Sequence, residues 1–595
     1  MPEYLAPGVF VEETSFRSKS IEGVSTSTTG FVGPTRKGPL NETPELITSF
    51  GDFERIYGGF ANLKFGEKIM PNYIAHAVKN YFDNGGRRLF IARVYQAPAG
   101  QDGLAASSAL TPAAGNPPPA DPPPPGPPPG NPPGSGKSVQ FKARTPGAVG
   151  NGTIKLTLKE AGIAKTALKK SPSGSLAVTP EVEGQEQTTY VKRGNDWEDS
   201  SGTKLEVKDD TKLILITLNV LTRDNDGDEL SFEDLGFSPG HPLYVGDVLN
   251  SDPSRRIDQL ENTFAITIGK DITPFELHSI LSQNSNISLS NGSDGLEPVT
   301  KSYNVASEGS SISPLERLGS IEDISIVAAP GYSAFQERQG IQDALITHAE
   351  SRRAYRIAVL DTRQGITPTG AIDDKSQIDS TYAALYYPWV WAANPNSQPG
   401  NKSIPSEILL PPSGFICGIF ARNDNQKGVA KSPGNEIVRG GLRFETDINF
   451  AQQEVLNPKG VNCLRFFPGR GNRLWGSRTT SSDPEWKYVG PRRYFLYLEH
   501  SIDRSTQWAV FENNGPRLWA NIRETISGFL YNEWKSGSLL GANPDEAFFV
   551  RCDRTTMTQN DLDNGRLICL VGVAVLKPAE FVVFRIGQKT ADSRG

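Results

Sequence analysis

Short apolar runs, some continuous and some alternating with polar residues, recur along most of this chain and predict strands. They are 29–32, 88–95, 153–158, 212–218, 264–268, 324–328, 355–361, 548–552, 566–576 and 580–586. Apolar residues at helical spacing predict helices at 71–82, 341–352, 491–510 and 516–535, and all but the second begin with a proline. After residue 314 strands and helices alternate, which is the rhythm of a parallel sheet.

The predicted elements form two α/β stretches around a β-rich middle. From about 137 to 305 the sequence is rich in Thr, Ser, Gly and Asp, and its apolar runs alternate with polar residues. Strands on both sides of this part look like pieces of one body, so we interpret about 96–310 as an insertion into that body. We therefore expect a multidomain, mixed α+β protein with an α/β core and a β-rich inserted outer domain.

A proline-rich segment separates the first α/β stretch from the β-rich middle. Residues 111–134 contain thirteen prolines and no other apolar residue larger than alanine. Such a segment cannot bury enough surface to offset its ordering entropy, so 96–136 is predicted to be a linker with a semi-rigid polyproline II stretch. The same composition fits a docking site for proline-binding modules, and this alternative stays open.

Length and charge limit the architecture and the partners of the chain. With 595 residues it is too long for one hydrophobic core, since single cores stop growing near ~250–300 residues. Lys and Arg total 61 against 67 Asp and Glu, which argues against a nucleic-acid coat. The first residues lack the basic region and the apolar run that a secretory signal needs, and the most apolar run, 567–576, has the length of a buried strand rather than of a membrane helix. We therefore expect a soluble protein made in a cytoplasm, without direct membrane insertion.

Motifs for catalysis or ligand binding are weak in this sequence. The four cysteines form no CxxC pair and the five histidines no HExxH, so neither a disulfide framework nor a metal or catalytic site is indicated. The GSGKS of 134–138 lacks the first P-loop glycine. The GRGNRL of 469–474 lacks the last glycine of a dinucleotide fingerprint and is better interpreted as a turn between two strands. Asp224 and Asp226 hint at a calcium loop, but their surroundings fit the motif poorly, and a solvated acidic turn is favoured.

Strongly β-prone runs lie close to both ends of the chain. One is 8–13, which a polar, Ser/Thr-rich stretch follows, and the other is 579–586. Strands on extended arms can add to the sheet of another subunit, where main-chain hydrogen bonds provide affinity. The simpler alternative is that both strands close the chain's own sheet, and the residues by themselves favour it.

Many segments of the chain resemble the phage tail sheath family, the contractile sleeve of phage tails and related injection systems. The opening YLAPGVFVEE at 4–13 and the GFVGPTRKGP at 30–39 are similar to that family, and VNCLRFFPGRGNRLWGSRT at 461–479 is the most specific match. The proline-rich 117–133 and the stretch 162–256 depart from the family pattern, which leaves their role open. Further similar segments, in family order, are 50–53, 141–152, 289–298, 322–331, 356–361, 382–390, 412–414, 421–424, 427–429, 546–552 and 578–581.

The resemblance implies a structural subunit rather than an enzyme. Sheath subunits polymerise as stacked six-membered rings around an inner tube, and the sheath contracts to drive the tube through a target envelope. The implied partners are other copies of the chain, the inner tube protein, the baseplate and terminator or cap proteins, with no cofactor and no nucleic acid. The particle would be a phage tail or a phage-tail-like injection system.

The resemblance also implies a division into domains and an exchange of terminal strands between subunits. The outer insertion would make few contacts along the sheath axis. The expected domains are a core sheath domain with N- and C-terminal strand arms at 1–20 plus 455–595, a second α/β domain at 21–95 plus 311–454, the linker at 96–136 and the outer domain at 137–310. The residues expected to exchange strands are Val9, Phe10, Val11, Phe581, Val582, Val583 and Phe584.

The predicted helix 516–535 is a candidate for the surface that faces the inner tube. A surface that must release and slide should be polar. The alternative is an ordinary core helix that packs its apolar side, which includes Leu518 and Leu530. The candidate tube-facing residues are Arg517, Arg523, Glu524, Glu533 and Lys535.

Two other classes of protein remain as alternatives. In the first, the chain is a surface-binding, adhesin-like protein with 137–310 as a carbohydrate-binding module and the proline-rich segment as its stalk. An enzyme is the second, and it would require a cleft with paired titratable groups. The sequence does not distinguish a phage from an extracellular or cell-anchored injection system.

Overall fold

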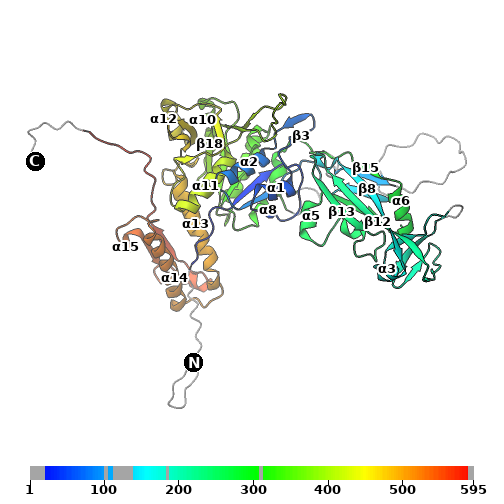
Figure 1. Cartoon of the computed structure of the whole chain (residues 1–595). Helices are drawn as coiled ribbons and strands as arrows, with labels where there is room; N and C mark the ends of the chain where they lie inside the picture. The colour runs from blue at the N-terminus through cyan, green and yellow to red at the C-terminus, as the bar shows by residue number, and fades with distance from the viewer. Residues whose placement is uncertain (1–20, 99–104, 111–137, 183–186, 307–311, 587–595) are drawn as a thin grey trace, which may run out of the picture.

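The protein is elongated, with three parts in a row: a helical C-terminal part, a central α/β body and a β-rich part (Figure 1). The computed structural model describes residues 21–98, 105–110, 138–182, 187–306 and 312–586. Most of the proline-rich segment and the N-terminal β-prone run therefore lie outside the described residues.

A nine-stranded sheet runs through the central body of the described chain. Its inner strands are parallel, and antiparallel pairs occur only at its two edges. The innermost strands are buried along their whole length, as expected for a parallel sheet that is covered on both faces. In spatial order the strands are β2 (Leu46–Ile47), β5 (Leu89–Arg93), β1 (Thr29–Gly33), β16 (Ile326–Ala328), β17 (Ile357–Asp361), β18 (Ala383–Tyr387), β23 (Val461–Phe467), β24 (Gly471–Trp475) and β21 (Glu436–Ile437).

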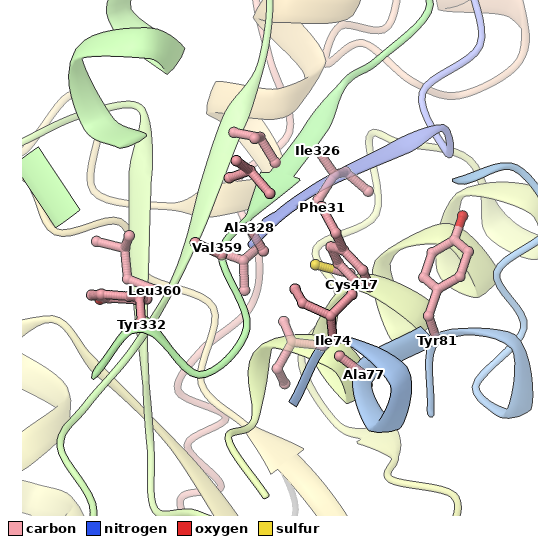
Figure 2. Close-up of a cluster of buried hydrophobic side chains, with 14 of the residues drawn as sticks. Phe31, Ile74, Ala77, Tyr81, Ile326, Ala328, Tyr332, Val359, Leu360 and Cys417 are labelled. Atoms are coloured by element: carbon pink, nitrogen blue, oxygen red, sulfur yellow. The ribbon is translucent and has the colours of Figure 1, made fainter. Parts of the chain in front are cut away.

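Helices cover both faces of this sheet. A Cβ on Gly30 of β1 would touch Leu318 and Ile324, whereas one on Gly33 would touch Ile74 of a different helix, so the two glycines face opposite layers. Figure 2 shows the layer on the side of Ile74, where buried apolar side chains of the sheet meet two helices. The helices of the body are α1 (Phe50–Tyr57), α2 (Tyr73–Asp83), α7 (Thr300–Asn304), α8 (Pro314–Gly319), α9 (Arg338–Glu350), α10 (Pro368–Ser376), α11 (Ser413–Lys427) and α12 (Phe450–Leu456).

Two glycines allow α11 to pack unusually closely against α2. A Cβ on Gly414 would lie 2.6 Å from the Cα atom of Ala77, and one on Gly418 would lie 2.5 Å from the carbonyl oxygen of Tyr81. These contacts are with backbone, which cannot move aside as a flexible side chain can. The four-residue spacing of the glycines places both on one face of α11, so this helix pair depends on glycine at both positions.

The β-rich part is an insertion between β5 and β16 of the large sheet. The chain leaves and re-enters the body at one place, since Gln96 and Leu296 form an antiparallel bridge. The residues described here form a seven-stranded and a three-stranded sheet around their own core. The elements are β6 (Ser107–Leu110), β7 (Val139–Ala143), β8 (Thr153–Ala164), α3 (Lys165–Lys170), β9 (Leu176–Val178), β10 (Thr189–Arg193), β11 (Asp196–Glu198), β12 (Lys212–Arg223), β13 (Glu229–Leu235), α4 (Val245–Val248), α5 (Arg256–Glu261), β14 (Phe264–Ile268), α6 (Pro274–Ser282) and β15 (Asn286–Ser288).

Two expected boundaries differ from the sheet pairing. The linker predicted at 96–136 contains β6, which pairs with β7 and so belongs to the three-stranded sheet. The boundary expected at 455 precedes β23 and β24, yet these strands extend the large sheet of the body. In both cases, the sheet to which a strand belongs depends on hydrogen-bond partners that are far away in sequence. The division into functional domains itself stays a prediction.

Candidate assembly surfaces

The C-terminal part is built around two long helices, α13 (Val489–Ser505) and α14 (Pro516–Lys535). Proline at the first position of α14 fits a helix start, because its missing N–H would have no partner there. The apolar side of α14 is buried with residues of α13 in a separate core, as the alternative reading of this helix predicted. The smaller elements are α15 (Pro544–Ala547), β25 (Phe548–Arg551), α16 (Gln559–Asp563) and β26 (Leu570–Val573).

Strands β25 and β26 form a two-stranded antiparallel sheet, and neither outer edge is paired with a further strand among the described residues. Within the described chain β25 has no second partner strand, so its outer edge presents free main-chain groups. The run 567–576 contains a strand, β26, but it is not buried: Leu570 is 50% and Val571 38% exposed. On the partner strand Phe549, which pairs with Gly572, is 50% exposed. A pair of strands with an exposed apolar surface is marginally stable alone and gains from a further strand.

The C-terminal β-prone run projects away from the rest of the chain (Figure 1). The strand predicted at 580–586 is absent, so the described part of this run does not close the chain's own sheet. Apolar side chains that follow one another are nevertheless in water. Their exposed fractions are 72% for Phe581, 68% for Val582, 76% for Val583, 83% for Phe584 and 96% for Ile586. The other expected exchange residues, Val9, Phe10 and Val11, lie outside the described residues.

The candidate tube-facing residues of α14 do not share one surface. Glu533 accepts hydrogen bonds from the hydroxyls of Tyr494 and Tyr497, both at 2.9 Å, and so faces α13. Its position was detectable in the sequence, because it continues the apolar face one turn beyond Phe529 and Leu530. Arg517, Arg523, Glu524 and Lys535 are exposed.

An ion-pair cluster that the sequence did not suggest joins the insertion to the body. Arg36 forms a two-pronged pair with Asp226, at 2.5 and 3.0 Å, and its third nitrogen lies 3.1 Å from Asp294. Next to it, Lys37 is 3.4 Å from Asp224. The acidic turn is therefore only partly solvated: Asp224 is buried against a lysine, whereas the side chain of Asp228 is 62% exposed. The only feature of the sequence that could have indicated this cluster is the pair of adjacent basic residues, Arg36 and Lys37, in a loop rich in glycine and proline.

The described residues offer little chemistry for catalysis. No group of His, Cys, Asp or Glu among them could hold a metal ion. In a cleft of about 670 Å³ near α13, Asp503 is already engaged by Arg353 and Tyr355. Burial lowers the pKa of His76 to about 4, which makes it a neutral core residue. The GRGNRL segment begins in the turn that joins β23 to β24, and its last four residues belong to β24 itself.

The part of the chain that is described contains no helix that is both long and apolar enough to span a bilayer. The cysteines are free thiols, and burial raises the pKa of Cys463 to about 12.

The C-terminal half of the chain matches two family models in succession. Residues 315–480 match the phage tail sheath protein central domain, and residues 481–589 match the phage tail sheath C-terminal domain. A protein of Pseudomonas aeruginosa (strain UCBPP-PA14) described as a prophage major tail sheath protein is 25% identical over 267 residues. That match covers 44% of this chain, and the chain spans 64% of the length of the Pseudomonas protein.

Two solved structures share the fold along nearly the whole chain. The helical sheath of the anti-feeding prophage in its contracted state has a TM-score of 0.52 at 19% identity, covering 99% of this chain and 100% of that one. The contracted sheath complex of PVC, an extracellular contractile injection system, has a TM-score of 0.50 at 17% identity, covering 99% of both chains. Nothing in these matches supports the adhesin alternative. The successive domain matches show that residues 315–589 belong to the phage tail sheath protein family, and the whole chain shares the fold of solved contractile sheaths.

Proposed function

We propose that this chain is the repeating subunit of a contractile sheath in a phage tail or a related injection system. Subunits assemble as stacked six-membered rings around an inner tube, and the contracting sheath drives the tube through a target envelope. The observation that carries the proposal is that a chain with the sheath C-terminal domain has both an exposed β-prone arm and a two-stranded sheet with an unpaired edge.

The arm and the open sheet complement each other chemically. Residues 581–584 are consecutive apolar residues with high strand propensity, and each is at least two-thirds exposed. The outer edge of β25 has the free N–H and C=O groups that such a strand needs. In a polymer, the arm of one subunit adds to the sheet of the next, and both apolar surfaces leave water. The N-terminal run with Val9, Phe10 and Val11 is proposed as a second exchanged strand.

Other partners follow from membership of the family. The inner tube protein, the baseplate and a terminator or cap are proposed to bind the assembled sheath. Arg517, Glu524 and Lys535 on the exposed side of α14 are candidates for the tube contact, and Arg523 is a weaker one because it reaches the carbonyl of Cys552. Glu533 would act indirectly, by fixing α14 on α13. The work of such a machine comes from two packings of one subunit and requires no active site.

The test is electron microscopy of the purified full-length protein and of a variant that ends at Glu580. The full-length protein should form hollow tubes with a regular axial repeat. Without 581–595 the subunit should keep its thermal unfolding midpoint, because the exposed arm packs on nothing described, but it should stay monomeric. Dispersed particles of the full-length protein at every salt and protein concentration would contradict the sheath function. Normal tubes of the truncated protein would contradict strand exchange by this arm.

A further inference from the structure

The base of the C-terminal arm is held by a single carboxylate with several donors. One oxygen of Glu580 accepts hydrogen bonds from Arg478 Nε at 2.8 Å and Asn457 Nδ2 at 2.6 Å. The other accepts from Arg478 Nη2 at 2.6 Å and the hydroxyl of Tyr488 at 2.9 Å. The ammonium group of Lys487 lies 3.9 Å from the same oxygen. Two-pronged, charge-assisted contacts of this kind fix direction as well as position.

The donors come from three separate places in the fold. Asn457 follows α12, Arg478 follows β24, and Tyr488 is the N-cap residue of α13. The carboxylate thus reaches the junction of the central body and the C-terminal part. Glu580 is the one member of this cluster that belongs to the arm.

The principal donor is itself immobilised. The side chain of Arg478 is 7% exposed. Its main chain exchanges two hydrogen bonds with the side chain of Asn462, each 2.7 Å long, and Asn462 is fully buried within the large sheet. The arm is therefore tied to the sheet through a chain of buried contacts.

The anchored and the free parts of the chain meet between Glu580 and Phe581. The Glu580 side chain is 18% exposed, whereas Phe581, the next residue, is 72% exposed. Burial opposes ionisation of Glu580, but the hydrogen bonds from Arg478, Asn457 and Tyr488 outweigh it and lower its pKa. The carboxylate keeps its charge and its donors at neutral pH.

We propose that Glu580 is a positioning residue for strand exchange: its contacts with Arg478, Asn457 and Tyr488 set the point and direction at which the arm leaves the subunit. This inference rests on the proposed sheath function. A slip of one residue would turn every side chain of the exchanged strand to the opposite face, so register matters. An arm that starts from a fixed point loses less freedom when it binds and is concentrated near one acceptor edge.

The experiment compares wild type with E580Q, Y488F and the control E454Q, which alters an exposed glutamate of α12. Hydrogen exchange of the monomer reports the state of the arm base, and sedimentation with electron microscopy reports the concentration needed for tubes. E580Q should exchange faster around 574–582 and need roughly ten-fold more protein to form tubes, because it loses contacts with a charged partner. Y488F should show a smaller change in the same direction, and E454Q none.

The outcomes separate this inference from the function on which it rests. If the wild type forms no tubes, the proposed function fails, and the positioning role fails with it. If the wild type forms tubes and E580Q forms them at the same concentration with the same axial repeat, only the positioning role is wrong. E580Q could unfold, because buried Arg478 loses its partner, and the Y488F variant then provides the test. If Y488F shows faster hydrogen exchange at the arm base but forms tubes as wild type does, the inference is wrong.

Discussion

At Asp361, the last residue of β17, a carboxyl group is buried, and none of the described residues places a cation beside it. Its two oxygens accept hydrogen bonds from the main-chain N–H of Ser413, at 2.7 Å, and from the Ser413 hydroxyl, at 2.6 Å. These bonds hold the first turn of α11 on the sheet. Burial outweighs them and raises the pKa of Asp361 to about 7.

The raised pKa makes the stability of the body depend on pH. The folded state holds the proton up to about pH 7, whereas the unfolded chain releases it near about pH 4. The contribution of this group to stability should therefore be fully present below about pH 4, be lost as the pH rises to about 7, and stay level above it. D361N mimics the neutral carboxyl, so its Tm should exceed that of wild type by several degrees at pH 7.5 and by much less at pH 4. Thermal unfolding across this range, with D343N on the exposed side of α9 as control, measures the gap. If the difference in Tm between D361N and wild type does not change with pH, Asp361 is not the group that makes stability depend on pH.

Arg493 and Asp424 form a buried pair that ties α13 to α11. The guanidinium makes two bonds to the carboxylate, at 2.9 and 2.6 Å, and the two side chains are 3% and 2% exposed. R493A should destabilise the protein by about 3–5 kcal/mol, since it leaves a buried carboxylate without its partner. K79A, which breaks an exposed pair with Asp83 within α2, should change stability by less than about 1 kcal/mol. Urea unfolding measures the free energy of unfolding of both variants. Equal losses of stability in R493A and K79A would contradict the role of burial.

At the scale of elements, the arm can be tested without shortening it. V583P removes a main-chain N–H that an added strand would donate, while V583T keeps both that N–H and the branched side chain. Because Val583 is 76% exposed in the free subunit, neither variant should change the Tm of the monomer. V583P should abolish tubes, and V583T should assemble nearly as wild type does. Tubes of V583P with normal appearance would show that this residue does not pair.

Elements with strong local signals could be predicted from the sequence, and those that depend on distant partners could not. The strand 264–268 and the helix 516–535 have the predicted bounds, because alternation defines the first and a proline start with apolar spacing defines the second. The runs at 567–576 and 580–586 have equally strong strand propensity, yet one is half exposed and the other forms no strand. Burial and pairing require a partner surface, which propensity does not contain.

The candidate site shows the same limit. The residues proposed for strand exchange, 581–584, could be chosen from their propensity and their place near the end of the chain, but the contacts of Glu580 could not. Its donors at 457, 478 and 488 are brought together only by the fold. For α14, the helical period already places Glu533 on the side that packs against α13, so the sequence could have separated it from the other four candidates.

At the scale of the whole molecule, the cluster around Arg36 sets how the insertion sits on the body. R36Q leaves Asp294, whose side chain is 1% exposed, without its cationic partner. The insertion should then lose its fixed orientation while both hydrophobic cores stay folded. We expect several-fold faster proteolysis near 96 and 296, and small-angle scattering of a more variable shape. K159A, which breaks an exposed pair within the insertion, is the control. Identical scattering of R36Q and wild type would contradict this role.

The chain enters and leaves the insertion side by side, at Gln96 and Leu296, so we expect that another domain could be inserted there in its place. Two backbones in an antiparallel bridge lie about 5 Å apart, so a guest domain with adjacent termini can replace the insertion without stretching the sheet. We expect the junction to tolerate the exchange, because Arg36 and Lys37 would face water as surface charges once the insertion is removed. A particle built from such a subunit would display one guest per copy, at a spacing dictated by the helical lattice.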